Sequence, residues 1–221
     1  MLLLCCAAFP SAAATSGFGW NTTVTLSPAG GHVLGNPDAA IKVVEYASYS
    51  CPYCARFSAE SEGPLRISYI GSGKVSFEVR NLLIHSFDLP LAMLVECGPK
   101  ERFFQNNVAF YRRLPRLTEK LDGLTQGQTA RWGSGTMAQR NRAIASDLQL
   151  YDIMESLGYG RMEVDKCLVD QTAAARITAQ SDAALALGVS GTPSFAINGS
   201  LMEDIHDWPG LRRIIDMSAS K

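Results

Sequence analysis

The sequence has no excess of charge of either sign. Twenty Lys and Arg residues stand against 21 Asp and Glu residues, which gives a net charge of −1 over 221 residues. Proteins that bind nucleic acid or an anionic membrane surface depend on a basic patch or stripe. The charge balance therefore argues against polyanion binding, and we expect no nucleic-acid partner.

The sequence also lacks an apolar run long enough for a membrane span at its N-terminus. Residues 1–14 have an apolar core followed by small residues that end in Ala12-Ala13-Ala14. A bilayer span requires about 20 apolar residues, whereas this pattern is typical of a secretory signal with its cleavage site. No Lys or Arg precedes the apolar core, so a hydrophobic N-terminus without a targeting role is the alternative. We expect residues 1–14 to be a signal peptide and the protein to be periplasmic or otherwise exported.

Metal-ligating residues are scarce. Once residues 1–14 are removed, four of the six cysteines remain, namely Cys51, Cys54, Cys97 and Cys167. An even number of cysteines in an exported protein suits disulfide chemistry. A zinc site at the Cys51/Cys54 pair would need two further ligands, and the three histidines, at positions 32, 85 and 206, are scattered. We therefore expect no metal and no other cofactor.

The pair Cys51-Pro52-Tyr53-Cys54 lies between a predicted strand and a predicted helix. Residues 41–47 are mostly apolar and β-branched, as in a buried central strand. Residues 55–69 favour helix, with a kink or break expected at Pro64. Residues 74–82 alternate as a second core strand. This order predicts a strand–helix–strand unit with the cysteines at its first junction.

The rest of the chain is predicted to be helical, followed by a hairpin. Helical spacing of apolar residues favours helices over 91–97, 103–114, 137–150, 151–157 and 172–187, with 123–135 as a polar, Gly-rich connection. Asn198-Gly199 between short apolar runs predicts a β-hairpin turn. Asp207 and Pro209 predict the start of a last helix. A hairpin over residues 20–26 and 32–34 precedes the core strand.

The position of Cys51 at a helix start predicts a reactive thiol. A cysteine attacks a disulfide as thiolate, and the free N–H groups and dipole of a helix N-terminus stabilise an anion. Pro52 suits the first helical position because it has no N–H to leave unpaired. Cys54 follows one turn later. We expect Cys51 to be the exposed attacking thiol and Cys54 the buried resolving thiol.

Two motifs in this order resemble the DsbA-like thiol:disulfide oxidoreductases of the thioredoxin superfamily. The first is Val44-Glu45-Tyr46-Ala47-Ser48-Tyr49-Ser50-Cys51-Pro52-Tyr53-Cys54, and the second is Gly188-Val189-Ser190-Gly191-Thr192-Pro193-Ser194-Phe195-Ala196-Ile197-Asn198-Gly199. The resemblance implies an α/β thioredoxin fold with an inserted all-helical domain. Its first part would span residues 20–84, the helical insertion 85–170, and the second part 171–221.

The resemblance also implies roles for individual residues. Pro193 would be the cis-proline that lies against the active site, and Thr192 would offer backbone groups to an extended substrate and tune the nearby sulfur. Glu45 would be a buried acid beneath the cysteines that helps proton transfer at Cys54. The alternatives are an ordinary turn proline and a strand-end carboxylate that reaches solvent. Pro52 and Tyr53 would complete the support of the active site.

The positions of Cys97 and Cys167 are similar to those of a second disulfide that some DsbA-like proteins carry in their helical domain, so the resemblance implies a Cys97–Cys167 bond. The alternative is two buried free thiols that pack as small apolar residues. The sequence departs from the best-known DsbA proteins at two points: Pro-Tyr stands between the active-site cysteines instead of Pro-His, and Thr192 rather than valine precedes Pro193. Both departures affect the expected reduction potential, whereas thiol–disulfide exchange at the two cysteines is still expected.

The function implied is that of an oxidase, which introduces disulfides into cysteine-containing exported polypeptides through the Cys51–Cys54 pair. A DsbB-like membrane protein would reoxidise it. Because no dimerisation domain precedes the thioredoxin fold, we expect a monomer. One alternative is a disulfide isomerase or reductase with the same site. The alternative from another class is a non-redox metal- or peptide-binding periplasmic protein.

Overall fold

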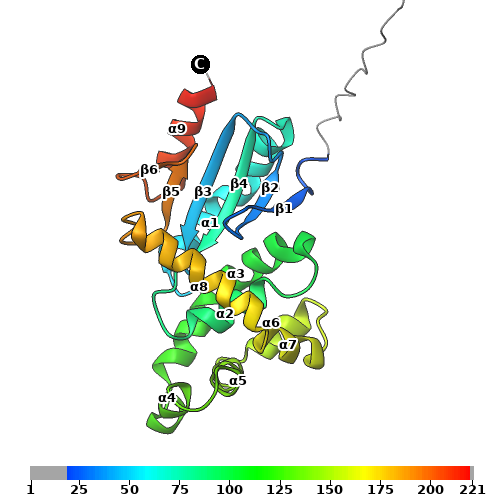
Figure 1. Cartoon of the computed structure of the whole chain (residues 1–221), viewed down its shortest axis with the longest axis vertical. Helices are drawn as coiled ribbons and strands as arrows, with labels where there is room; N and C mark the ends of the chain where they lie inside the picture. The colour runs from blue at the N-terminus through cyan, green and yellow to red at the C-terminus, as the bar shows by residue number, and fades with distance from the viewer. Residues whose placement is uncertain (1–18, 220–221) are drawn as a thin grey trace, which may run out of the picture.

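A six-stranded mixed sheet forms the centre of the molecule (Figure 1), which a computed structural model describes for residues 19–219. The predicted signal peptide, residues 1–14, lies outside the described residues. The strands are β1 (Val24–Leu26), β2 (His32–Gly35), β3 (Ile41–Ala47), β4 (Val75–Asn81), β5 (Ser194–Ile197) and β6 (Ser200–Met202), in the order β1-β2-β4-β3-β5-β6. Only β3 and β4 are parallel.

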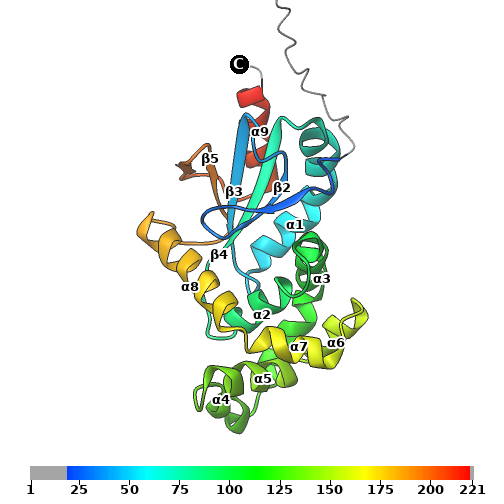
Figure 2. The same cartoon turned by 45° about the vertical axis from the view of Figure 1, so that its right-hand side comes forward.

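Helices cover both faces of the sheet and form a separate block at one end of it. They are α1 (Pro52–Pro64), α2 (Asp88–Val95), α3 (Phe103–Asp122), α4 (Gln126–Trp132), α5 (Met137–Asp147), α6 (Leu150–Ser156), α7 (Arg161–Leu168), α8 (Gln171–Ala186) and α9 (Trp208–Ala219). Figures 1 and 2 show α2 to α7 beside the lower end of the sheet, and α8 across the junction. The predicted fold class, a thioredoxin fold with a helical insertion, is confirmed.

The two faces of β3 explain where the active-site helix packs. All residues of β3 except Lys42 are buried, as expected for a strand covered on both sides. Side chains alternate along a strand, so Val43 and Ala47 join the core under α1, whereas Val44 and Tyr46 join a smaller cluster with Ala184 of α8. Glu45 shares the face of Val43 and Ala47. The strand thereby directs this carboxyl toward the helix that carries the cysteines.

The helical block departs from the sequence prediction in two segments. Residues 123–135, predicted to be a connection, contain α4, because Thr125 and Gln128 form a reciprocal capping box that starts a helix despite the nearby glycines. Helix α7 was not predicted either, so Cys167 lies within a helix rather than before one. Helix α3 continues through Pro115 to Asp122, where Leu114 and Leu117 stay buried on either side of the proline.

Helix α1 ends at Pro64, where a kink or break was expected. The chain continues directly as a π-helical segment, Leu65–Tyr69, and then as a short 3-10 turn, Ile70–Ser72. Gly73 then ends the segment in the left-handed conformation, with φ 75°.

The predicted hairpin turn at Asn198-Gly199 is confirmed. Both residues have positive φ, 50° and 86°, as a tight two-residue turn requires. Asp207 caps α9 as predicted, since its Oδ1 accepts a hydrogen bond from the Gly210 N–H at 2.8 Å. These two short motifs let β5 and β6 complete the sheet beside β3, and α9 packs against β3 and α1.

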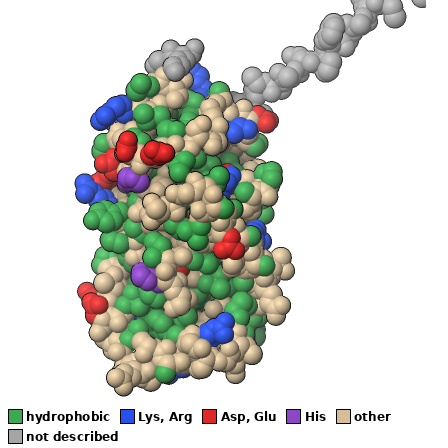
Figure 3. Space-filling view, turned by 60° about the vertical axis from the view of Figure 1, so that its left-hand side comes forward, with side chains coloured by type: hydrophobic (Ala, Val, Ile, Leu, Met, Phe, Trp, Pro, Cys, Tyr) green, Lys and Arg blue, Asp and Glu red, His purple; other side chains and the backbone are tan. Residues whose placement is uncertain are grey.

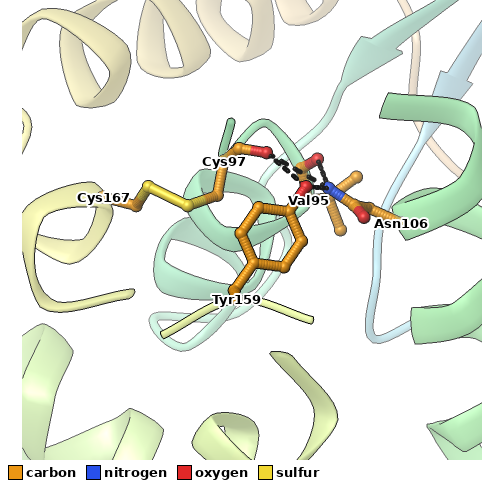
Figure 4. The surroundings of a disulfide bond; sticks show 5 residues. All are labelled: Val95, Cys97, Asn106, Tyr159 and Cys167. Atoms are coloured by element: carbon orange, nitrogen blue, oxygen red, sulfur yellow. Dashed lines mark hydrogen bonds between the residues drawn. A yellow bond between two sulfur atoms is a disulfide. The ribbon is translucent and has the colours of Figure 1, made fainter. Parts of the chain in front are cut away.

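A disulfide joins Cys97, just after α2, to Cys167 in α7 (Figure 4). The S–S distance is 1.99 Å, and 70 positions separate the two residues in the sequence. The Asn106 side-chain amide lies within hydrogen-bonding distance of the carbonyl oxygens of Val95 and Cys97 and of the Tyr159 hydroxyl. The Tyr159 hydroxyl donates to the Cys97 carbonyl at 2.9 Å. The buried Cys97 end of the disulfide thus lies in a hydrogen-bonded part of the helical block.

Among residues 19–219, no helix is long and apolar enough to cross a membrane.

Candidate active site

Cys51 occupies the N-cap position of α1, directly after the turn that follows β3. Its backbone is extended, with φ −89° and ψ 118°, and Pro52 is the first helical residue. The Cys51 carbonyl accepts the first helical hydrogen bond, from the Ala55 N–H at 3.2 Å. Cys54 lies one turn further along α1. The junction of strand and helix therefore places the first cysteine where free N–H groups converge.

The exposure of the two thiols differs less than predicted. Cys54 is fully buried, but Cys51 is also covered, with 7% of its surface exposed. The expectation of an openly exposed Cys51 is therefore wrong. The cause is the Thr192-Pro193 loop, whose Thr192 carbonyl oxygen lies 3.2 Å from the Cys51 sulfur. An incoming sulfur has to reach Cys51 past this loop.

The surroundings of Cys51 favour its thiolate and lower its pKa from 9.0 to about 6. The largest contribution is a hydrogen bond from the Cys54 thiol, which outweighs the opposing effect of burial. The Thr192 side chain and the N–H groups of Cys54 and Tyr53 contribute further hydrogen bonds. The helix N-terminus thus stabilises the thiolate as predicted, through the N–H groups of Cys54 and Tyr53. Its contribution to the lowered pKa is smaller than that of the Cys54 thiol.

Cys54 has the opposite tendency. Burial raises the pKa of its thiol well above the ordinary value, and the hydrogen bond to Cys51 and the charge of Glu45 add to the effect. Two thiols whose environments drive their pKa values apart divide the roles in exchange chemistry. Cys51 is therefore the thiol that ionises first, and Cys54 keeps its proton.

Glu45 is buried beneath the cysteines, with 3% of its surface exposed. Burial raises the pKa of its carboxyl to about 8, and the negative charge of Cys51 adds to the shift. One carboxyl oxygen, Oε1, has no hydrogen-bond partner among the described residues. A cavity of about 30 Å³, lined in part by Glu45, Ser58, Ser61 and Asn107, adjoins it. Its volume suits about one water molecule.

The second predicted motif packs against the first. The Thr192–Pro193 peptide bond is cis, and β5 begins directly after it. The Thr192 hydroxyl is buried, and a hydrogen bond from this side chain to the Cys51 sulfur helps lower the pKa of Cys51. Residues far apart in the sequence, Cys51 and Thr192, are thereby brought together, as the resemblance implies.

Asp88, which no sequence motif indicates, is hydrogen-bonded to the turn that precedes Cys51. Asp88 is 1% exposed, and its Oδ2 accepts hydrogen bonds from the N–H groups of Ile84 and His85 and from the Ser48 hydroxyl. It joins the segment before α2 to the turn before Cys51. An aspartate at the start of a predicted helix is usually interpreted as a cap, so no sequence signal pointed to this contact.

Three large hydrophobic side chains are exposed on segments that lead to the site. Tyr53, Ile84 and Leu187 are large hydrophobic residues that are 68%, 49% and 59% exposed. They come from the start of α1, from the segment before α2, and from the loop before Pro193. Figure 3, which brings the left side of Figure 1 forward, shows a broad hydrophobic area on this side. A groove of about 360 Å³ between α1 and α3 also begins beside Pro52.

No three His, Cys, Asp or Glu side chains within residues 19–219 are grouped as metal ligands.

Comparison with known proteins agrees with this geometry. A family model described as thioredoxin matches residues 27–217. A crystal structure described as a protein-disulfide isomerase from Novosphingobium aromaticivorans has a TM-score of 0.83 and 41% sequence identity, covering 87% of this chain and 98% of that one. The chain is 24% identical to disulfide bond formation protein D of Bacillus subtilis, over 89% of this chain and 81% of that protein.

Some relatives are longer than this chain. A Rickettsia bellii relative is 28% identical over 78% of the chain, but the chain spans only 58% of that protein's length. The resemblance to DsbA-like oxidoreductases, predicted from two motifs, is confirmed by these relatives.

Proposed function

The chain belongs to the thioredoxin family, and from that premise we propose that it is a thiol:disulfide oxidoreductase that uses Cys51 and Cys54. The observation that carries this proposal is the pairing of a Cys51 thiol whose pKa is lowered to about 6 with a buried Cys54 thiol whose pKa is raised. Such a pair closes into a disulfide and reopens with defined roles for each sulfur.

In the oxidising direction, a substrate thiolate attacks the Cys51 sulfur of the Cys51–Cys54 disulfide. The bond between the two cysteines breaks, a mixed disulfide forms at Cys51, and Cys54 leaves as a thiolate. Glu45, which holds its proton up to about pH 8, is the acid that protonates Cys54. A second substrate thiolate then attacks the substrate sulfur, and Cys51 leaves as the stabilised thiolate. The substrate loses two electrons and gains a disulfide, and the enzyme becomes a dithiol.

The stabilised Cys51 thiolate favours the oxidase over the reductase. Anything that stabilises the reduced form makes the disulfide a stronger oxidant, by about 30 mV for each 1.4 kcal/mol. The second candidate is a disulfide isomerase with the same site. It is favoured by the 41% identity to a structure described as a protein-disulfide isomerase.

Cysteine-containing exported polypeptides are the proposed substrates. The exposed apolar side chains Tyr53, Ile84 and Leu187 suit an unfolded chain, which presents apolar residues beside its cysteines. We further propose that the protein acts as a monomer in the periplasm or an equivalent compartment after loss of residues 1–14. A DsbB-like membrane protein is the proposed oxidant that restores the disulfide.

The equilibrium reduction potential against glutathione tests the direction of electron flow. A potential of about −120 mV is expected for an oxidase, about −180 mV for an isomerase, and about −270 mV for a reductant. Cys51→Ser should abolish oxidation of a reduced, unfolded model protein. Full activity in that variant would contradict the proposed chemistry itself.

A further inference from the structure

The groove between α1 and α3 reaches the active site. Pro52, the residue that follows Cys51, is the lining residue nearest the start of α1, and the groove has a volume of about 360 Å³. Helix α3 packs against α1 along this side of the molecule (Figure 2). Apolar side chains from both helices line much of the groove, namely Ala55, Ala59, Val108, Leu114 and Pro115. An apolar channel thus adjoins the residue next to the reactive thiol.

The groove continues along the same two helices. A second cavity, of about 620 Å³, shares the lining residues Glu62, Val108 and Arg112 with it and extends to Asn21, ahead of β1. Ligand sites in proteins typically have volumes of about 300–1,000 Å³. The two cavities together therefore have room for a segment of polypeptide rather than for a single side chain.

A different face of α1 borders a smaller cavity beside Asp207. Positions three and four apart lie on one face of a helix, as Ala55 and Ala59 do in the groove. Arg56 and Glu60 have the same spacing, but they line the other cavity, of about 240 Å³. The start of α1 therefore lies between two separate depressions, and the second one serves as a comparison for the first.

Arg112 is the one cation of the groove that has no paired carboxylate among residues 19–219. Glu62 is paired with Arg66, with Oε1 and Nε 3.1 Å apart. Glu101, which lines the second cavity, is paired with Lys100 at 3.0 Å. Arg112 is exposed and lines both cavities. Because a guanidinium presents its N–H donors in a fork that matches a carboxylate, the groove suits a chain with an acidic side chain.

We propose that the α1–α3 groove binds the segment of a substrate polypeptide next to its reacting cysteine, and that Arg112 gives the groove a preference for an acidic side chain in that segment. The inference rests on the proposed function, because it assumes a substrate joined to Cys51 by a mixed disulfide. The apolar lining holds the chain, and the guanidinium pairs with its carboxylate. Arg112 determines specificity and takes no part in the exchange of sulfurs.

The experiment measures how fast the Cys51–Cys54 disulfide oxidises two unfolded peptides of equal length at low salt. Both peptides have two cysteines among apolar residues, which are interspersed with aspartates in one peptide and with lysines in the other. Arg112→Glu should slow the reaction of the aspartate peptide about threefold and accelerate that of the lysine peptide about threefold, as expected for a surface ion pair. Dithiothreitol is too small to occupy the groove, so its rate should be the same in wild type and variant.

The matched control is Arg116→Glu, which makes the same change of charge about one turn further along α3. Arg116 is exposed and lines a different cavity, next to Gln149. The ratio of the aspartate-peptide rate to the lysine-peptide rate should therefore stay near the wild-type value. Equal ratios in Arg112→Glu and Arg116→Glu would overturn the proposal, because the net charge of the protein would then account for the preference.

A second measurement locates the peptide in the mixed disulfide that a single-cysteine form of the aspartate peptide makes with Cys54→Ala, where the reaction stops at Cys51. The backbone amide signals of Ala59 and Val108 should shift relative to the same variant joined to 2-mercaptoethanol, and that of Glu60, beside the other cavity, should shift less. Unchanged signals at Ala59 and Val108 would overturn the proposal. So would signals that respond only to protein concentration, which would assign the groove to a second copy of the chain, or only to removal of residues 1–18.

The rates separate the two levels of inference. If the wild-type disulfide oxidises neither dithiothreitol nor the peptides, the proposed function fails. If it oxidises all three, and Arg112→Glu leaves both peptide rates unchanged, only the role of the groove fails.

Discussion

The Cys51 sulfur lies 3.2 Å from the carbonyl oxygen of Thr192, a residue 141 positions away in the sequence. One belongs to the start of α1 and the other to the loop before β5, and both elements extend from neighbouring strands, β3 and β5. This approach also places the Thr192 side chain beside the sulfur, and a hydrogen bond from it helps lower the pKa of Cys51. Part of the acidity of the thiol therefore depends on a contact that the unfolded chain does not have.

The reduced protein should consequently show a thiolate that disappears on unfolding. Absorbance at 240 nm should rise with a midpoint near pH 6, the value to which the pKa of Cys51 is lowered. In denaturant the midpoint should return to about 8.5. Because the pKa of Cys51 is lower in the folded state, its thiolate contributes stability to the reduced protein that is complete above about pH 8.5 and is lost as pH falls through about 6. The oxidised protein should lack this contribution.

The matched variant for that titration is Cys54→Ala. The hydrogen bond from Cys54 makes the largest contribution to the lowered pKa of Cys51, so its removal should move the 240-nm midpoint above pH 6. An unchanged midpoint would mean that the helix N-terminus and Thr192 suffice to stabilise the thiolate.

Glu45→Gln should make the protein more stable at neutral pH. Burial and the nearby Cys51 charge raise the pKa of Glu45 to about 8 in the folded state, against about 4.3 when unfolded. Between these values the unfolded chain releases a proton that the folded protein keeps, so wild-type stability falls as pH rises. The gain on substitution should be on the order of 3 kcal/mol at pH 7 and vanish near pH 4. Urea unfolding at several pH values measures it.

Glu119→Gln, on the exposed face of α3, is the control for Glu45. It should leave the pH dependence of unfolding unchanged. Equal stability of wild type and Glu45→Gln from pH 4 to pH 8 would show that Glu45 titrates as an exposed carboxyl does.

Most of the fold followed from local sequence signals. The strand at residues 41–47, the turn at Asn198-Gly199 and the cap at Asp207 each depend on residues close together in the chain. The glycines in residues 123–135 favoured a connection, although Thr125 and Gln128 form the capping box that starts helix α4. The passage of α1 into a π-helical segment at Pro64 was missed because burial of Leu65 and Ile70 holds that segment in place.

The candidate site likewise contains residues that sequence motifs predict and residues that only the tertiary structure brings together. Cys51 and Cys54 form a motif, and Glu45, Thr192 and Pro193 were implied by the resemblance to a known family. The contacts of Asp88 could not be predicted, because they join segments whose proximity depends on the tertiary structure. The same holds for the coverage of Cys51, which results from the approach of Thr192.

Removal of the Cys97–Cys167 disulfide should destabilise the protein without preventing exchange at Cys51. The bond closes a loop of 70 positions, for which the loss of chain entropy corresponds to about 4 kcal/mol. The double variant Cys97→Ala/Cys167→Ala should therefore unfold at a lower denaturant concentration. The control is Cys51→Ala/Cys54→Ala, compared with oxidised wild type. It opens a much smaller ring and should cost less, and an equal loss in both would contradict the entropic account.

Asp88→Ala should loosen the segment that leads into α2. Asp88 is buried, and its Oδ2 accepts hydrogen bonds from the N–H groups of Ile84 and His85 at 2.7 and 2.9 Å. Removing this acceptor leaves two donors unpaired, which costs about 1–3 kcal/mol for each one that stays buried. Amide hydrogen exchange at Ile84 and His85 should accelerate by about tenfold or more, whereas exchange in β3 should follow global stability only.

Two variants separate the local effect of Asp88 from a general loss of stability. Asp88→Asn keeps an oxygen acceptor at the same place and should retain most of the protection at Ile84 and His85. Ser48→Ala removes the third hydrogen-bond partner of the Asp88 carboxylate, 3.1 Å away, and should leave both amides protected. If Asp88→Asn and Asp88→Ala exchange equally fast at these amides, the carboxylate oxygen is not what holds the segment. The position of the exposed Ile84 would then depend on the packing of α2 alone.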